Sequence, residues 1–274
     1  MPTLRAPTPK PVVVPAIHGN VGVQLAYQRK LQRLIAQMAA SVQWWLKATY
    51  RAHPPLHTDH MAQDAPSAML ALRATLDRLT RHWQGRFDEL APEIARIFAT
   101  TSTATAQRAM MDAFKRAGFT VSFKPTARAM EGLRAVIGEN VSLIRSIPEQ
   151  YLKDVEGQVW RSVAAGGDLQ ALTNGLTSKY GIAQRRAETI ARDQNNKATA
   201  VVENIRRQEL GIKQAIWQHS GAGKEPRPEH VKAGRDKLVF DLDKGAYLEG
   251  KWVLPGQEIN CRCTSRSIIP GIDT

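Results

Sequence analysis

Apolar residues recur at helical spacing through most of the chain, from about residue 21 to residue 208. In the first stretch, which ends before Pro54 and Pro55, the apolar positions are Tyr27, Leu31, Leu34, Ile35, Met38, Val42, Trp45 and Leu46. Residues three and four apart lie on the same side of an α-helix, so this spacing predicts an amphipathic helix that buries one face.

Further helices are predicted between residues that interrupt helical hydrogen bonding. Pro148 has no backbone N–H, and Gly118 and Gly181 favour helix ends. Asp168 is placed to cap the helix after it, because its carboxylate can accept a hydrogen bond from a free backbone N–H. These helices are predicted after Pro66 and over about 91–117, 127–146, 149–165, 169–181 and 183–208.

The two ends of the chain differ from this helical middle. Residues 1–20 contain five prolines, which predict an extended arm that becomes ordered only against a partner. Beyond Gly211, short apolar runs alternate with Gly and Pro, and this texture is typical of a small α+β unit. Its predicted strands cover about 212–218, 238–240 and 247–254, and the run at 120–123 fits either a strand or an extended connection.

The predicted fold is therefore a mainly α-helical body with a small C-terminal α+β domain and an extended proline-rich N-terminal arm. The predicted domains are the arm at 1–20, the helical domain at 21–208 and the α+β domain at 209–274. The six tryptophans are expected in the core, because each falls on an apolar face or strand. Prolines interrupt the only apolar stretch near the N-terminus, so we expect no signal peptide and synthesis in the cytosol.

The net charge of +13 is unevenly spread along the chain. Residues 1–130 hold 17 Lys and Arg against 7 Asp and Glu, a balance of +10, whereas 131–180 carry −1 and 181–274 carry +4. A basic first half suits an anionic partner such as double-stranded DNA bound without sequence preference, although a solvated basic face is the simpler alternative. The candidate DNA contacts are Arg73, Arg78, Arg81, Arg86, Lys115 and Arg116.

The most specific signal lies in the last 60 residues. A tryptophan at the end of a predicted strand is followed by a Gly-containing loop, by Arg and His three residues apart, and by the segment PGQEINCRC. The motif residues are Trp217, Arg227, His230, Pro255, Gly256, Asn260, Cys261, Arg262 and Cys263. Together with the helix containing IARDQNNKATA, this combination resembles the phage Mu F-like head morphogenesis family over about residues 140–270.

The resemblance implies a minor capsid protein of a tailed-phage head, a structural component and not an enzyme, with no cofactor. It further implies partners: the phage portal protein, and a major capsid or scaffold protein during procapsid assembly. The implied location is the virion head, in the interior near the portal vertex and beside the packaged DNA, and the host cytoplasm during assembly. A membrane is not among the implied partners.

The alternative function is a metal-dependent nucleic-acid-processing enzyme that uses His230 and the Cys261/Cys263 pair. Arg227 and His230 fit one side of a helical turn, where they can bind a phosphate and transfer a proton. Glu225, Glu229 and Asp236 are candidates to orient the imidazole. The sequence shows no nucleophile with an identifiable base, however, which favours the structural function.

His219, His230, Cys261 and Cys263 are residue types that bind zinc. Paired cysteines in structural zinc sites are usually separated by two to four residues, whereas one residue separates this pair, so no bound metal is expected. A disulfide across one residue would be strained. The two thiols are therefore expected to pack as small apolar side chains.

Overall fold

The computed structural model describes residues 10–54, 65–165, 167–223 and 225–270 of the 274-residue chain. The protein is mainly helical and has a small strand-containing C-terminal region, as the sequence predicts. Four long helices precede that region: α1 (Val21–Ala52), α2 (Ala65–Arg116), α3 (Ala127–Ala164) and α4 (Leu169–Glu209). None of the described helices combines the length and the apolar character that crossing a membrane requires.

Three of the four long helices continue through residues at which the sequence predicts a helix end. Pro92 lies inside α2, Pro148 inside α3 and Gly181 inside α4, so the helix breaks predicted near these residues were wrong. An interior proline costs about 3 kcal/mol. Burial on both sides of it offsets this cost: Ile147 and Tyr151, which flank Pro148, are 1% and 3% exposed.

Two of the predicted helix boundaries are confirmed. The Asp168 carboxylate accepts a hydrogen bond of 2.7 Å from the backbone N–H of Gln170, so Asp168 caps the start of α4. Gly118 follows the end of α2 in a left-handed conformation with φ of 89°, which glycine adopts without steric cost.

The chain folds into two compact units, and each of the four long helices contributes to both. We call Leu25–Ile97 with Ile137–Ala191 the bundle unit, and Met1–Gln24 with Phe98–Val136 and Arg192–Thr274 the sheet unit. The units group residues differently from the predicted domains at 1–20, 21–208 and 209–274, and that division of the chain stays a prediction.

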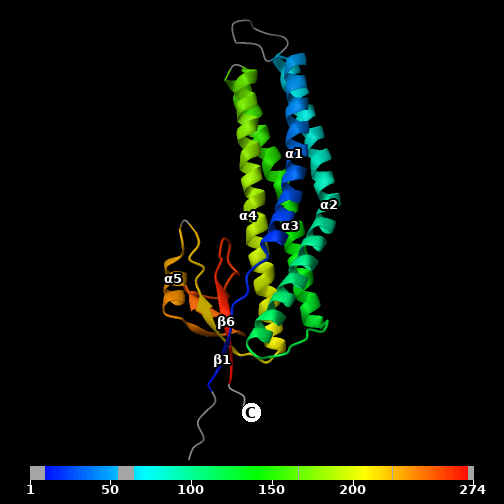
Figure 1. Ribbon diagram of the computed structural model, residues 1–274. Coiled ribbons are helices and arrows are strands. Elements are labelled where there is room, and N and C mark those ends of the chain that lie inside the picture. The colour runs from blue at the N-terminus through cyan, green and yellow to red at the C-terminus, as the bar shows by residue number, and fades with distance from the viewer. Residues whose placement is uncertain (1–9, 55–64, 166, 224, 271–274) are drawn as a thin grey trace, which may run out of the picture. The chain divides into compact units, whose positions relative to one another are not determined.

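The bundle unit consists of four helical segments that lie side by side (Figure 1). Both apolar contacts and side-chain hydrogen bonds hold these segments together. Tyr27 Oη donates to Asn140 Oδ1 at 2.9 Å between α1 and α3, and the hydroxyls of Tyr50 and Ser162 meet at 3.0 Å between the same helices. The Gln184 amide donates to the backbone carbonyl of Gln32, which links α4 to α1.

Seven of the eight apolar positions predicted for the first helix face are buried; Trp45 is the exception.

The sheet unit contains a four-stranded antiparallel sheet in the order β1-β6-β2-β3. Its strands are β1 (Val12–Val14), β6 (Thr264–Ile269), β2 (Gln214–Gln218) and β3 (Val239–Asp241). The unit also contains a separate hairpin of β4 (Ala246–Leu248) and β5 (Lys251–Val253), and the short helix α5 (Pro228–Arg235). The run at 120–123 is a connection and not a strand, and β1 and β6 were not predicted.

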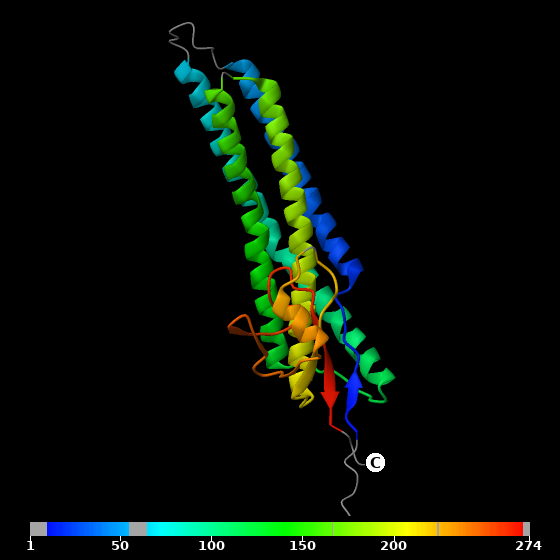
Figure 2. The ribbon, with the colours of Figure 1, turned by 90° about the vertical axis from the view of Figure 1, so that its left-hand side faces the viewer.

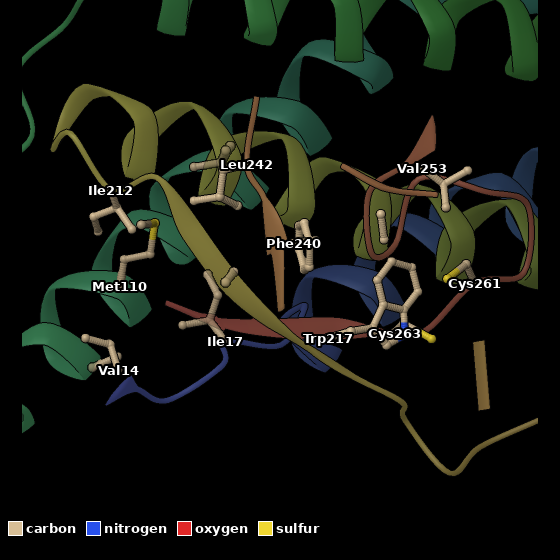
Figure 3. Close-up of a cluster of buried hydrophobic side chains, with 14 of the residues drawn as sticks. Val14, Ile17, Met110, Ile212, Trp217, Phe240, Leu242, Val253, Cys261 and Cys263 are labelled. Atoms are coloured by element: carbon tan, nitrogen blue, oxygen red, sulfur yellow. The ribbon is translucent and has the colours of Figure 1, made fainter. Parts of the chain in front are cut away.

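The predicted N-terminal arm is not confirmed as a free segment. Residues 1–9 lie outside the described residues, and Val12–Val14 pair with Ser267–Ile269, so that β1 and β6 run antiparallel side by side (Figure 2). Val14 and Ile17 are 1% and 6% exposed and belong to the core of the sheet unit (Figure 3). The described part of the arm therefore docks on its own protein.

The expectation that all six tryptophans lie in the core was also wrong. Trp83 and Trp217 are buried, but Trp44, Trp45 and Trp252 are exposed by 62%, 39% and 57%. Arg78 covers the Trp45 ring at 4.2 Å from its centroid, so a cation–π contact partly replaces core packing there.

A buried ion pair connects α4 to β6 within the sheet unit. Arg207 pairs with Glu203 one turn away, and it donates to the hydroxyl and to the backbone carbonyl of Ser265, each at 2.7 Å. Both charged side chains are buried, and burial raises the pKa of Glu203 to about 7 even though Arg207 lowers it. Arg206 is buried too, where it contacts Glu209 and the carbonyl of Lys124.

We predict that Arg207→Met destabilises the protein by roughly 3–5 kcal/mol at pH 8, because Glu203 remains buried without its counterion. Loss of the guanidinium raises the pKa of Glu203 further, and a carboxyl with a raised pKa holds its proton more tightly in the folded state. The variant should therefore regain stability as the pH falls from 8 to 5. Urea unfolding at both pH values measures this, with Arg185→Met, an exposed position of α4, as the control. Equal, pH-independent losses in the two variants would contradict the prediction.

The docking of β1 predicts unequal effects at neighbouring positions. Val14→Ala should cost about 2 kcal/mol of unfolding free energy, because Val14 is 1% exposed in the core. Val13→Ala should cost less than about 0.5 kcal/mol, because Val13 is 41% exposed. The same urea measurement compares them, and equal effects would mean that β1 does not pack in this register.

Candidate functional site

The motif residues gather at one end of the sheet unit. Trp217, from β2, is 1% exposed and meets the His230 ring of α5 edge to face, with ring centroids 5.0 Å apart. Figure 3 shows Trp217 beside Cys263, with Cys261 and Val253 close by. Three parts of the chain that are distant in sequence therefore form one site, which we call the CRC site: Trp217, His230 and the turn at 255–263.

The two thiols face the same nitrogen of the same imidazole. Cys261 Sγ lies 3.7 Å and Cys263 Sγ 3.8 Å from His230 Nδ1, and all three residues are buried. Both cysteines are free and buried, as the sequence predicts. A hydrogen bond from Cys263 lowers the pKa of Cys261 to about 5, against the opposing effect of burial, and the same contact together with burial raises the pKa of Cys263.

The local chain path sets this geometry. Successive side chains of an extended segment point to opposite sides. Cys261 and Cys263 therefore fall on one side, and Arg262, which lies between them in sequence, falls on the other. Gly256 turns the chain with φ of 80°, and a Cβ there would approach the Ala200 Cβ of α4 to 3.1 Å. The Asn260 backbone N–H donates to Asp193 at 2.6 Å, which fixes the same turn to α4.

Glu258 joins the charged residues of the CRC site. Its carboxylate lies 3.5 Å from Arg227 Nε and 3.3 Å from His230 Nε2, and it also pairs with Lys251. Burial raises the pKa of Glu258, but the hydrogen bond from Lys251 and the charges of Arg227, Lys251 and His230 outweigh this and hold the pKa below its usual value.

Glu258 was not among the predicted site residues, because the motif was defined by Pro255, Gly256 and Asn260–Cys263 and not by the positions between them. Glu225, Glu229 and Asp236 were the residues expected to orient the imidazole, but Glu258 is the carboxylate that faces His230 Nε2. Glu229 accepts a hydrogen bond from the backbone of Glu249, and Asp236 contacts Arg235 at 3.0 Å. The signal that was available is the proximity of Glu258 to Cys261 within the motif.

A cavity of about 640 Å³ borders the CRC site. The cavity is lined by all three buried ligand-type residues and by three arginines, and its lining includes Arg192, His219, Arg227, His230, Cys261 and Arg262. His219 lies on its wall, apart from the group that His230 forms with the two cysteines, and accepts a hydrogen bond from the Gly221 N–H. The thiols, the imidazole and the carboxylate thus lie one beside the next along a basic cavity, and the sequence did not predict the carboxylate's place in this arrangement.

The six DNA-contact candidates are all exposed, but they are not equivalent. Arg73, Arg78, Arg81 and Arg86 lie in the bundle unit, whereas Lys115 and Arg116 lie in the sheet unit. Arg86 pairs with Glu89 at 2.7 Å, and Arg78 stacks on Trp45. Arg73 and Arg81 lie about 80° apart around α2, since eight residues make about 2.2 helical turns.

These observations define a mainly helical protein whose sheet unit contains a buried Cys-His site. Residues 153–266 match the family described as Phage Mu protein F like protein, which confirms the resemblance seen in the sequence. An uncharacterized protein of Haemophilus influenzae is 31% identical over 143 residues. That alignment covers 52% of this chain and 30% of the relative, so the chain spans about a third of the relative's length. No solved structure matches the chain.

The charges around Glu258 predict a pH-dependent contribution to stability. Glu258→Gln should cost about 1–2 kcal/mol at pH 7, because it removes the counterion of Arg227 and Lys251. A carboxylate with a lowered pKa stabilises the folded state above its unfolded pKa, and it loses that effect as the pH falls through its folded pKa. The difference from the unsubstituted protein should therefore shrink below about pH 4.

The matched control is Glu249→Gln, since Glu249 pairs with Arg227 at 3.7 Å and is more exposed. It should cost less than about 1 kcal/mol. Thermal unfolding between pH 3.5 and 7 measures both variants. A Glu258→Gln effect no larger than the control, or constant with pH, would show that Glu258 does not organise the site.

Proposed function

We propose that the chain is a minor head protein of a tailed phage and acts in head morphogenesis. The observation that carries this proposal is the family match over residues 153–266, which includes every motif residue from Trp217 to Cys263. The geometry supports it, because Trp217, His230 and the two cysteines build a buried junction between β2, α5 and the 255–263 turn. Such a junction suits a structural part, and both thiols are too buried for easy attack on a large substrate.

The finer proposal is that the protein sits at the portal vertex, inside the head, and assembles with the procapsid. Its support is the family resemblance alone. Stopping translation of its gene in the encoding phage should lower the infectious titre by orders of magnitude, and supply of the chain in trans should restore it. Co-purification of the intact chain with the portal protein tests the partner. Infectious particles that form normally without the chain would overturn the proposal.

We also propose that the basic first half contacts packaged DNA through phosphates. The support is the balance of +10 in residues 1–130 and the exposure of the six candidate side chains. Arg73 and Arg81 are the best placed, because Arg78 and Arg86 already contact Trp45 and Glu89. The competing occupant of this surface is an acidic face of the portal.

Salt dependence separates these occupants. If about four phosphates are neutralised, binding of the intact chain to random-sequence duplex should weaken with salt at a log–log slope of about −3.6. Arg73→Gln with Arg81→Gln should bring the slope nearer zero by about 2. Arg185→Gln with Lys213→Gln removes equal charge at exposed positions beyond residue 130 and should leave the slope nearly unchanged. Negligible affinity at low salt would assign the charge to the portal.

A further inference from the structure

His230, Cys261 and Cys263 present three metal-binding atoms to one point. His230 Nδ1 lies 3.7 Å and 3.8 Å from the two sulfurs, and the three atoms all lie within 4.8 Å of one another. Around a tetrahedral zinc ion, with bonds of about 2.3 Å to sulfur and 2.0 Å to nitrogen, such ligands lie about 3.6 Å apart. We propose that these three atoms bind one zinc ion.

The surroundings hold the imidazole in the orientation that such a site requires. The other ring nitrogen, His230 Nε2, lies 3.3 Å from Glu258 Oε2, and neither of these two buried atoms has another hydrogen-bond partner in the described part of the chain. In metal sites a carboxylate commonly takes the second ring N–H and leaves the other nitrogen for the metal. The edge contact with Trp217 fixes the plane of the ring.

Charge balance favours the ion as well. Two thiolates and one divalent cation make a neutral centre, which can be buried at a far lower cost than a separate thiolate. This suits three residues that are 3%, 3% and 6% exposed. The spacing of the cysteines argued against zinc when taken alone, but the His230 side chain supplies a third ligand that no spacing rule reveals.

The ligand types select zinc over harder ions. A second group, His230 with Glu249 and Glu258, offers two carboxylates and is partly exposed. Magnesium and calcium prefer oxygen ligands, whereas thiolate and imidazole together suit zinc. The buried sulfur group is therefore the site, and Glu258 supports it from behind the imidazole.

The fourth coordination position faces the cavity beside the CRC site. Structural zinc ions are held by four protein ligands, whereas three protein ligands leave one position for water or another small ligand. His219, the fourth candidate from the sequence, belongs to the cavity wall and not to the ligand group. Water therefore completes the coordination, and the ion joins α5 to the 255–263 turn.

Metal binding by the intact, reduced chain tests this proposal. After removal of metal, added zinc should bind at one ion per chain, and cobalt(II) in its place should give a sulfur-to-cobalt charge-transfer band and the intense visible bands of a tetrahedral ion. Cys261→Ser with Cys263→Ser should abolish both signals. His219→Ala should retain them, and Glu258→Gln should weaken zinc affinity by about 10- to 100-fold.

The cobalt spectrum of the unsubstituted protein decides the matter even if the double serine variant does not fold. Absence of zinc binding in the folded protein would overturn the proposal. So would cobalt binding without the sulfur band, which would point to the carboxylate group, or binding that survives in the double serine variant. Head assembly is not part of this test, so the metal site and the proposed function can fail independently.

Discussion

The buried guanidinium of Arg207 is the interaction on which the sheet unit depends. It satisfies Glu203 within α4 and reaches across to the hydroxyl and the carbonyl of Ser265. Ser265 belongs to β6, which pairs with β1 on one side and β2 on the other. A guanidinium can make several directed hydrogen bonds at once, so one side chain fixes the strand that connects both ends of the chain. The CRC segment leads directly into this strand and inherits its position.

The helical part of the fold was predictable because its signal is local. Apolar spacing identified the face of α1, and Asp168 was recognised as a cap from its chemistry. The breaks predicted near residue 91, at Pro148 and at Gly181 were wrong for a tertiary reason: a residue with poor helix propensity is tolerated where buried neighbours on both sides hold the helix together. Propensity measures only the cost of such a residue and not the packing that offsets it.

The strands at the two ends were not predictable from local pattern. Val12–Val14 sits among prolines, and a strand of three residues becomes stable only when a partner completes its hydrogen bonds. Its partner, Ser267–Ile269, is more than 250 residues away in sequence. At the CRC site the ligand-type residues were evident from the sequence, but the contact between His230 and the two cysteines depends on how α5 and the 255–263 turn are placed. Glu258 was missed for the same reason, since its role comes from Arg227, His230 and Lys251, which the fold brings to it.

The distinction between buried and exposed charge also limits what net charge can say about partners. The arginines of α4 illustrate this, because Arg206 and Arg207 resemble a solvated basic pair in the sequence yet are 4% and 3% exposed. Their charge is neutralised by Glu209 and Glu203 and is unavailable to a polyanion. On α2 the pairing of Arg86 with Glu89 and the stacking of Arg78 on Trp45 reduce the available charge further. The charge that an anionic partner could reach therefore comes from exposed side chains such as Arg73 and Arg81, and it is smaller than the total charge of the sequence suggests.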